Sequence, residues 1–424
     1  MNYQKTIFKN NFRLISIPMK DTQTVTVMIG VGVGSRYEEE KEAGLSHFIE
    51  HMLFKGTKKR PNTLAIAETI DAVGGEFNAF TGKTSTVYYA KVDAQHWKIA
   101  LDVISDMYLN SQFKRSEIER EKGTILQELN MYEDIPMRNI EDIWEKLLYG
   151  KYKLGREIIG YKKTIRKFKR KDFINYFKRF YIPNDTVLVV AGNVSSQLIL
   201  SQTKKYFTNL SSQKKPVIEK IKEKQTKPQI KIRFKKTDQT HFILGARAYN
   251  LFHPDRYVLN LLATILGGGM SSRLFIQVRE RKGLAYYVKA SVDAYQDVGY
   301  LAISAGVEHK NLQQAIKIII QELNKIKKRK ITEKELAKAK NYIKGKMIMK
   351  LESSDEIASF VMNQELLMNK IEKPQEIFQK IEAVTTEDIK RVAQDVFTSN
   401  KMNLAIIGPH KSASENKIKK ELFL

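Results

Sequence analysis

The chain has 424 residues, with 73 Lys or Arg against 47 Asp or Glu, which gives a formal net charge of +26. It contains no cysteine, which excludes disulfide bonds and thiolate metal sites and leaves nitrogen and oxygen atoms as metal ligands. The basic residues are spread along the chain without interleaved aromatic residues, so we expect no nucleic-acid partner. A chain of this length predicts two domains or more.

The N-terminal stretch, residues 1–11, has no sustained apolar region of the kind found in signal peptides. No apolar run in the chain is long enough to span a bilayer. We therefore expect a cytoplasmic protein without a membrane partner.

The first segment with chemical content is the helix predicted to follow Gly44. His47 and His51 stand four positions apart, so on a helix both imidazoles lie on one face and can reach one cation. Glu50 lies on nearly the same face, where it could take a proton from water at that cation. This order, H-x-x-E-H, occurs among zinc peptidase signatures. The alternative is a core helix that carries two histidines by chance.

A zinc site of this type needs a third protein ligand and one position left open for water. The predicted helix over residues 115–129 offers Glu121 and Glu128, seven apart on one face. One carboxylate could bind the metal while the other orients a histidine. The alternative is a solvated acidic face, and the spacing does not decide which glutamate would be the ligand.

A polar, charged segment bracketed by prolines, residues 211–228, predicts a linker. It separates an N-terminal domain, residues 1–210, from a C-terminal domain, residues 229–424. The first would be the zinc-binding catalytic domain, and the second would lack a zinc site.

The two domains are divergent copies of one another. A shift of 215 lays residues 27–31 over 242–246, and a shift of 216 lays residues 188–192 over 404–408. Each copy begins with strands, continues with long helices and ends with an apolar strand. This order predicts an α+β fold in which each copy has an antiparallel-rich sheet with helices packed on one face. At the shift of 215, the positions of His47, Glu50 and His51 are taken by the apolar residues Leu262, Ile265 and Leu266.

The H-x-x-E-H segment, with Glu121 and Glu128 downstream, resembles the pitrilysin/insulinase family of zinc metallopeptidases, in particular its half-size, processing-peptidase-like members. Three further segments share this resemblance: the predicted edge strand 74–81, the glycine-rich loop 267–275 and the segment 279–286. The resemblance implies one zinc ion in the catalytic domain.

The resemblance assigns roles to the residues of the predicted site. His47, His51 and Glu128 would bind zinc, Glu50 would be the general base, and Glu121 would support the site from beside a ligand. Arg279 and Tyr286 of the second domain would act on the substrate, and the strand that carries Asn78 and Ala79 would pair with an extended peptide.

The resemblance also implies an architecture and a function. The processing-peptidase-like architecture pairs two half-size chains into a clamshell dimer, either a homodimer or a heterodimer of paralogues. The implied function is that of a zinc metalloendopeptidase that hydrolyses short or unfolded peptides inside a closed chamber. The alternative is a non-catalytic or activating partner subunit of a processing-peptidase-like complex.

Overall fold

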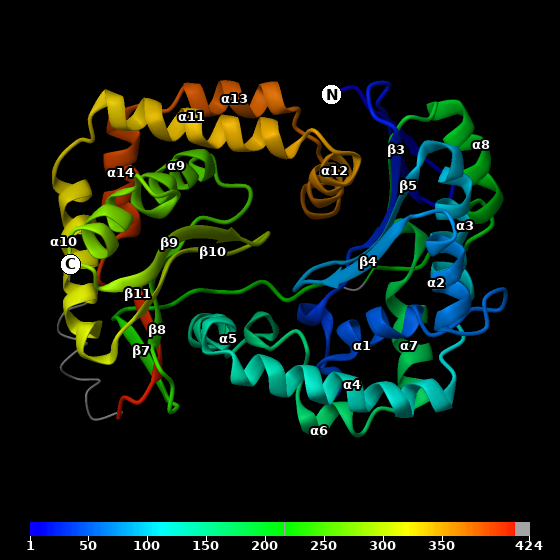
Figure 1. The fold of residues 1–424 in the computed structure, drawn as a ribbon, viewed down its shortest axis with the longest axis horizontal. Coiled ribbons are helices and arrows are strands. Elements are labelled where there is room, and N and C mark those ends of the chain that lie inside the picture. The colour runs from blue at the N-terminus through cyan, green and yellow to red at the C-terminus, as the bar shows by residue number, and fades with distance from the viewer. Residues whose placement is uncertain (216, 412–424) are drawn as a thin grey trace. The chain divides into compact units, whose positions relative to one another are not determined.

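Two mixed β-sheets form the framework of the chain, which this computed structural model describes for residues 1–215 and 217–411. Each sheet belongs to its own spatial unit together with several helices (Figure 1), and this confirms the predicted α+β fold with two domains. Unit 1 consists of Met1–Asn130, Arg156–Ile218 and Ile348–Lys373, and unit 2 consists of Met131–Gly155, Glu219–Met347 and the described residues from Pro374 onward.

The sheet of unit 1 has six strands, and only β2 and β6 pair in parallel. The predicted strand at residues 74–81 is β4, which lies at one edge of this sheet, as expected. In spatial order the strands are β1 (Gln4–Ile7), β2 (Arg13–Pro18), β6 (Thr186–Gly192), β3 (Thr24–Val31), β5 (Thr86–Asp93) and β4 (Glu76–Thr81).

The helices of unit 1 include both predicted site helices, α1 and α4. The α-helices are α1 (Leu45–Leu53), α2 (Thr63–Asp71), α3 (Trp97–Asn110), α4 (Arg115–Asp134, most of which belongs to this unit), α6 (Lys162–Ile165), α7 (Arg170–Phe180), α8 (Ser196–Phe207) and α12 (Ser354–Met368). Short 3-10 turns occur at Ser35–Tyr37, Glu40–Glu42, Ala94–His96 and Pro183–Asp185.

The sheet of unit 2 repeats the topology of the first without an equivalent of β1. Its spatial order is β7 (Gln229–Phe234), β11 (Met402–Gly408), β8 (Thr240–Ala248), β10 (Gly299–Val307) and β9 (Ala285–Ala294), with β7 and β11 in parallel. These strands follow the order β2, β6, β3, β5 and β4 one for one, as duplication of a whole domain predicts.

The helices of unit 2 are α5 (Pro136–Tyr149), α9 (Arg256–Gly267), α10 (Leu312–Lys328), α11 (Glu333–Lys350, most of which belongs to this unit), α13 (Pro374–Glu382) and α14 (Thr386–Val396). Single turns occur at Lys153–Gly155, His309–Asn311 and, in the π-helical form, Phe275–Glu280.

Each sheet has helices on both faces, whereas the sequence predicts helices on one face. The difference arises because one helix of each copy belongs to the unit built by the other copy. In unit 1, α3 packs on β3 and β5, while α12 covers the opposite face (Figure 1). Val187, Val189 and Ala191 of β6 share a core cluster with α12. Leu188 and Val190 are also buried and point the other way, since alternate strand residues face opposite sides.

The same exchange occurs in unit 2, where α5 packs on β8 and β11. Ile143, Trp144 and Leu148 of α5 share a core cluster with Ile243 of β8 and Ile407 of β11. The units therefore do not follow chain order at residues 131–155 and 348–373.

The predicted linker has no helix or strand at residues 211–215 and 217–228. Pro216 in this linker and residues 412–424 of the predicted C-terminal domain lie outside the described residues. The domain boundaries expected from the sequence stay a prediction. Within the described residues, every helix is too short or too polar to cross a membrane.

Candidate metal centre

The helix that carries both histidines begins where a distant carboxylate satisfies its first backbone amides. Gly44 precedes α1 with φ 95°, a left-handed conformation that favours glycine, and it has no side chain to cap the helix. Instead, the carboxylate of the buried Glu38 accepts hydrogen bonds from the backbone N–H groups of Gly44 at 2.8 Å and of Ser46 at 2.7 Å. Burial raises the pKa of Glu38 to about 7, although these hydrogen bonds act in the opposite direction.

The apolar side of α1 anchors the helix in the core of unit 1. Phe48 and Ile49 are fully buried, and Phe48 packs edge-on against Phe173 of α7 with ring centroids 4.8 Å apart. With this side packed, the imidazoles of His47 and His51 lie together, with ring centroids 4.6 Å apart. The predicted helix and its histidine face are confirmed.

Glu128 of α4 completes a group of three ligand atoms. Its Oε2 atom is 3.6 Å from Nε2 of His47 and 3.5 Å from Nε2 of His51. Zinc binds these ligand types at about 2.0–2.2 Å, so two ligands of a tetrahedral ion lie roughly 3.3–3.6 Å apart. The three side chains therefore fit a zinc ion, and they form the one group with metal-binding geometry among the described residues.

Glu121 lies beside this group and contacts one of its imidazoles. Its Oε1 atom is 2.8 Å from Nδ1 of His51, and its Oε2 atom is 2.7 Å from Nζ of Lys55. Burial raises the pKa of this carboxyl, but the hydrogen bonds and charges of His51 and Lys55 outweigh burial, so the pKa lies below its ordinary value. A carboxylate on Nδ1 directs Nε2 of His51 toward the ligand group.

Glu50 lies on α1 between the two histidines in sequence. Its Oε2 atom is buried and has no hydrogen-bond partner among the described residues. The hydroxyls of Tyr88 and Tyr181 bond to each other at 2.8 Å, and after burial the charge of Glu50 helps to raise the pKa of both. A carboxylate with an unpaired buried oxygen, one position before a candidate metal ligand on the same helix, suits a proton acceptor.

Nδ1 of His47 is likewise buried without a partner among the described residues. The two histidines therefore differ, because His51 has its Nδ1 atom fixed by Glu121. Of these two imidazoles, His51 is therefore the one that has a carboxylate on Nδ1.

The predicted substrate strand lies beside α1, the helix that carries both histidines. In β4, Asn78 pairs with Tyr89 and Ala79 with Tyr88 of β5, and the opposite side of β4 pairs with no strand among the described residues. Helix α1 contacts β4, and Phe54 after α1 packs against Phe77 with ring centroids 5.6 Å apart. A free strand edge can accept an extended peptide. The pairing of β4 with a substrate peptide stays a prediction.

Arg279 and Tyr286 both lie in unit 2 and contact each other. Arg279 is in the π-helical turn, and its guanidinium carbon is 5.8 Å from the ring centroid of Tyr286, which is 74% exposed at the start of β9. The metal group belongs to unit 1, so the action of these two residues on a substrate stays a prediction.

Two residues of the site, Glu38 and Lys55, are not identified by the sequence reasoning. Lys55 stands four positions after His51, which is the spacing of one helical turn, and this spacing is the signal that could have drawn attention to it. Glu38 precedes the helix by a loop, and no local pattern connects it to Gly44.

Family models match most of the chain. The model described as "Insulinase (Peptidase family M16)" matches residues 13–162, and the model described as "Peptidase M16 inactive domain" matches residues 167–343.

Similar proteins cover nearly the whole chain. The "Uncharacterized zinc protease YmxG" of Bacillus subtilis (strain 168) is 37% identical, over 95% of this chain and 97% of its own. The "Uncharacterized zinc protease SCO5738" of Streptomyces coelicolor is 31% identical, over 98% and 91%. Among solved structures, a protease from Helicobacter pylori has a TM-score of 0.90 at 25% identity, over 96% of this chain and 100% of its own. An M16 inactive domain from Pseudomonas fluorescens has a TM-score of 0.87 at 19% identity, over 97% and 98%.

Proposed function

The chain belongs to the insulinase family of peptidases (peptidase family M16), and on this premise we propose that it is a zinc-dependent endopeptidase. One observation carries the proposal: the Nε2 atoms of His47 and His51 and a carboxylate oxygen of Glu128 have the spacing of three zinc ligands. When bound, zinc lowers the pKa of water to about 7 and polarises a carbonyl group as a Lewis acid.

Glu50 is the proposed general base. It would accept a proton from the attacking water and later donate it to the leaving amine, as a positioned carboxylate can do in both steps. Its buried, unpaired Oε2 atom supports this role. Glu121 would hold His51 in the tautomer that carries the proton on Nδ1.

The substrate would be a short or unfolded peptide. An extended backbone can add to the free edge of β4 at Asn78 and Ala79, whereas a folded protein has no free strand to offer there. Tyr286 would donate its hydroxyl hydrogen to the developing oxyanion, and Arg279 would bind a substrate carbonyl. Both roles come from the family resemblance, and their mutual contact supports a joint function.

The family resemblance further supports a closed chamber made by two chains, either identical or paralogous. The N-terminal stretch without a sustained apolar region supports a location in the cytoplasm. Native mass and zinc content together test the two-chain part of the proposal. Two chains with two zinc ions would indicate a symmetric enzyme, and one zinc ion per pair would indicate an unequal partnership. A monomer that cleaves peptides would contradict the chamber.

The competing function is that of a non-catalytic partner subunit. Glu50→Gln separates the two, because it removes the base and keeps the metal ligands. We expect this variant to retain zinc and to lose cleavage of an unstructured peptide by at least ~100-fold, the lower range for a positioned base. The control is Glu119→Gln, an exposed glutamate on α4 that pairs with Lys122, which is expected to cleave as wild type does. Equal activity of the Glu50 variant and wild type would refute the assignment.

A further inference from the structure

Lys55 contacts the same buried carboxylate that binds His51. Its Nζ atom is 2.7 Å from Oε2 of Glu121, and the other oxygen of Glu121 is 2.8 Å from Nδ1 of His51. The side chain of Glu121 is 4% exposed and that of Lys55 is 22% exposed. One carboxylate is therefore shared, one oxygen each, between an imidazole and an ammonium group.

A carboxylate this deeply buried is stabilised by a partner on each oxygen, because a buried charge without partners is costly. If His51 were the single donor, Oε2 of Glu121 would lack the ammonium that now faces it, and the carboxylate could rotate away from the imidazole. With Lys55 on Oε2, both oxygens are held, and the carboxylate plane has one orientation. The contact therefore restricts the group that orients a proposed metal ligand.

The backbone of Lys55 is itself held at the end of α1. Its N–H donates to the carbonyl of Met52 at 3.1 Å. The next residue, Gly56, has φ 127°, and a Cβ atom there would lie 2.5 Å from the carbonyl oxygen of Pro61. The chain therefore makes a sharp turn immediately after Lys55, and this turn requires glycine at position 56.

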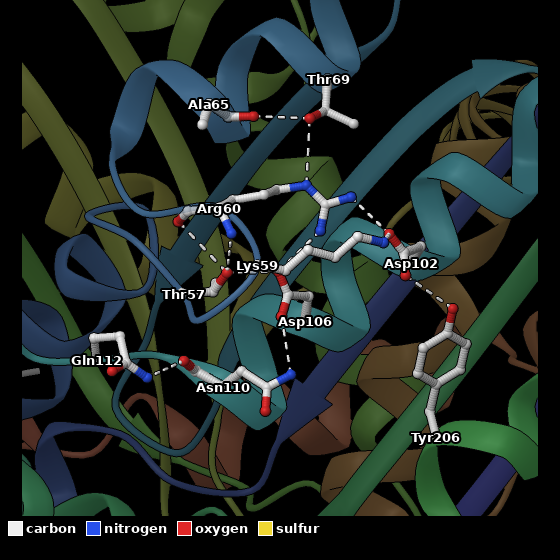
Figure 2. A network of polar contacts seen from close by, with 10 residues as sticks. All are labelled: Thr57, Lys59, Arg60, Ala65, Thr69, Asp102, Asp106, Asn110, Gln112 and Tyr206. Carbon is white, nitrogen blue, oxygen red and sulfur yellow. Dashed lines mark hydrogen bonds and ion pairs between the residues drawn. The ribbon is translucent and has the colours of Figure 1, made fainter.

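A network of buried charges ties the turn after Lys55 to α3 (Figure 2). Arg60 is 6% exposed and donates to Asp106 at 2.8 Å and to Asp102 at 2.6 Å. The hydroxyl of Thr57 donates to the same oxygen of Asp106 at 2.6 Å. Because both aspartates are on α3, the loop between α1 and α2 has little conformational freedom. The backbone from which the side chain of Lys55 extends is therefore fixed.

The second copy of the fold lacks all three members of this contact chain. At the shift of 215 that lays α1 over α9, Lys55 and His51 correspond to Met270 and Leu266. At the shift of 218 that lays the start of α4 over the start of α11, Glu121 corresponds to Ala339. The carboxylate and the ammonium are thus absent from the copy that has no histidine at the position of His51.

We propose that Lys55 is a positioning residue of the metal centre, which acts by holding Glu121 in the orientation that accepts the Nδ1 proton of His51 and presents Nε2 to the metal. This inference rests on the proposed function, since it requires that the group binds zinc. Lys55 acts through Glu121, so its effect must vanish when Glu121 can no longer accept both contacts.

The test is the zinc dissociation constant, measured by competition with a chelator for wild type, Lys55→Met, Lys55→Arg, Glu121→Gln and the Met/Gln double variant. An ammonium near a divalent cation also repels it, so the titrations are made at about 1 M salt, where the Debye length is about 3 Å and charges beyond contact are screened. Loss of a group that orients a ligand weakens metal binding by about 10–100-fold, which is the expectation for Glu121→Gln.

For Lys55→Met we expect zinc binding weakened by about 3–10-fold, less than for loss of the orienting carboxylate itself. Lys55→Arg is expected to restore binding to within about twofold, since it keeps a charged donor. The double variant should bind zinc as Glu121→Gln does, because coupled residues are not additive. The visible spectrum of the Co²⁺-loaded protein should change in Lys55→Met and return to the wild-type form in Lys55→Arg.

Lys122→Met is the matched control, because Lys122 is on α4 next to Glu121 in sequence and its ammonium pairs with Glu119. It should bind zinc as wild type does. Wild-type affinity in Lys55→Met, or a further loss in the double variant, would overturn the inference. If Lys55→Met proves unfolded in its metal-free thermal transition, Lys55→Gln, which keeps a donor without the charge, decides by the same comparison. A wild-type protein that binds no zinc would overturn the proposed function instead.

Discussion

A fragment of residues 1–218 is expected not to fold by itself, although it contains every proposed metal ligand. The sheet of unit 1 is covered on one face by α12, which lies far beyond this fragment in the chain. The fragment would also carry α5, whose apolar face packs on strands of unit 2. Two apolar surfaces would therefore face water in the fragment.

The size of the effect follows from the side chains that α12 and the residues after it bury. Five large apolar residues in this segment are at most 9% exposed and belong to the core cluster of the sheet. Burial of such a side chain contributes about 1.5–3 kcal/mol, so the five together contribute roughly 8–15 kcal/mol. This is as large as the whole stability of an ordinary domain, about 5–15 kcal/mol. The five residues are Ile357, Val361, Met362, Leu366 and Ile371.

Urea unfolding followed by near-ultraviolet circular dichroism measures the result. Fragment 1–218 should show no cooperative transition and no stoichiometric zinc binding. A second fragment, in which residues 348–373 follow 1–218 through a flexible linker, should regain a transition, since the sheet is covered again. A cooperative transition in fragment 1–218 alone, with one bound zinc ion, would show that the cover by α12 is dispensable and would refute the reasoning.

Two further predictions concern the segments that precede and follow α1. Arg60→Met leaves the charge of Asp106, whose side chain is 4% exposed, without its partner, and should lower the free energy of unfolding in urea by roughly 3–5 kcal/mol. Lys59→Met, at a side chain 60% exposed, should lower it by less than about 1 kcal/mol. Equal losses in the two variants would contradict the buried network. Burial raises the pKa of Glu38 from 4.5 to about 7, so the folded state holds the carboxyl proton more tightly than the unfolded state does. The contribution of Glu38 to stability therefore falls by at most ~3 kcal/mol as the pH rises from about 4.5 to about 7. Urea unfolding of the metal-free protein at pH 5 and pH 8 should show this loss in wild type and not in Glu38→Gln, and a difference between the two proteins that does not vary with pH would oppose it.

The sequence was sufficient to predict the candidate metal-binding face, because a helical period of 3.6 residues places His47 and His51 together whatever the rest of the fold does. The spacing also predicted that Glu121 and Glu128 share a face of α4, but not which of them lies against the imidazoles, and only the family resemblance named Glu128 as the ligand. In the structure Glu128 meets both Nε2 atoms, while Glu121 is occupied by His51 and Lys55. A lysine near a helix end is ordinarily solvated, so no local pattern marks Lys55 as a partner.

The fold shows a similar limit. Strand periodicity and the repeat predicted two α+β copies, and the matching strand orders of the two sheets agree with this. The apolar faces of α5 and α12 could be read from the sequence as faces to be buried. Which sheet buries them could not, because amphipathicity defines a face of a helix and not its partner. The exchange of these two helices between units is a property of tertiary packing alone.

The two copies together indicate why the first one keeps costly polar groups. In α9 the positions that match the site residues are filled by Leu262, Ile265 and Leu266, all at most 4% exposed, so apolar residues suffice to pack this helix in the same fold. In α1, Nδ1 of His47 and Oε2 of Glu50 are buried without hydrogen-bond partners among the described residues, at about 1–3 kcal/mol for each group. Packing cannot account for that cost, because the second copy packs without it, whereas the proposed metal binding and proton transfer can.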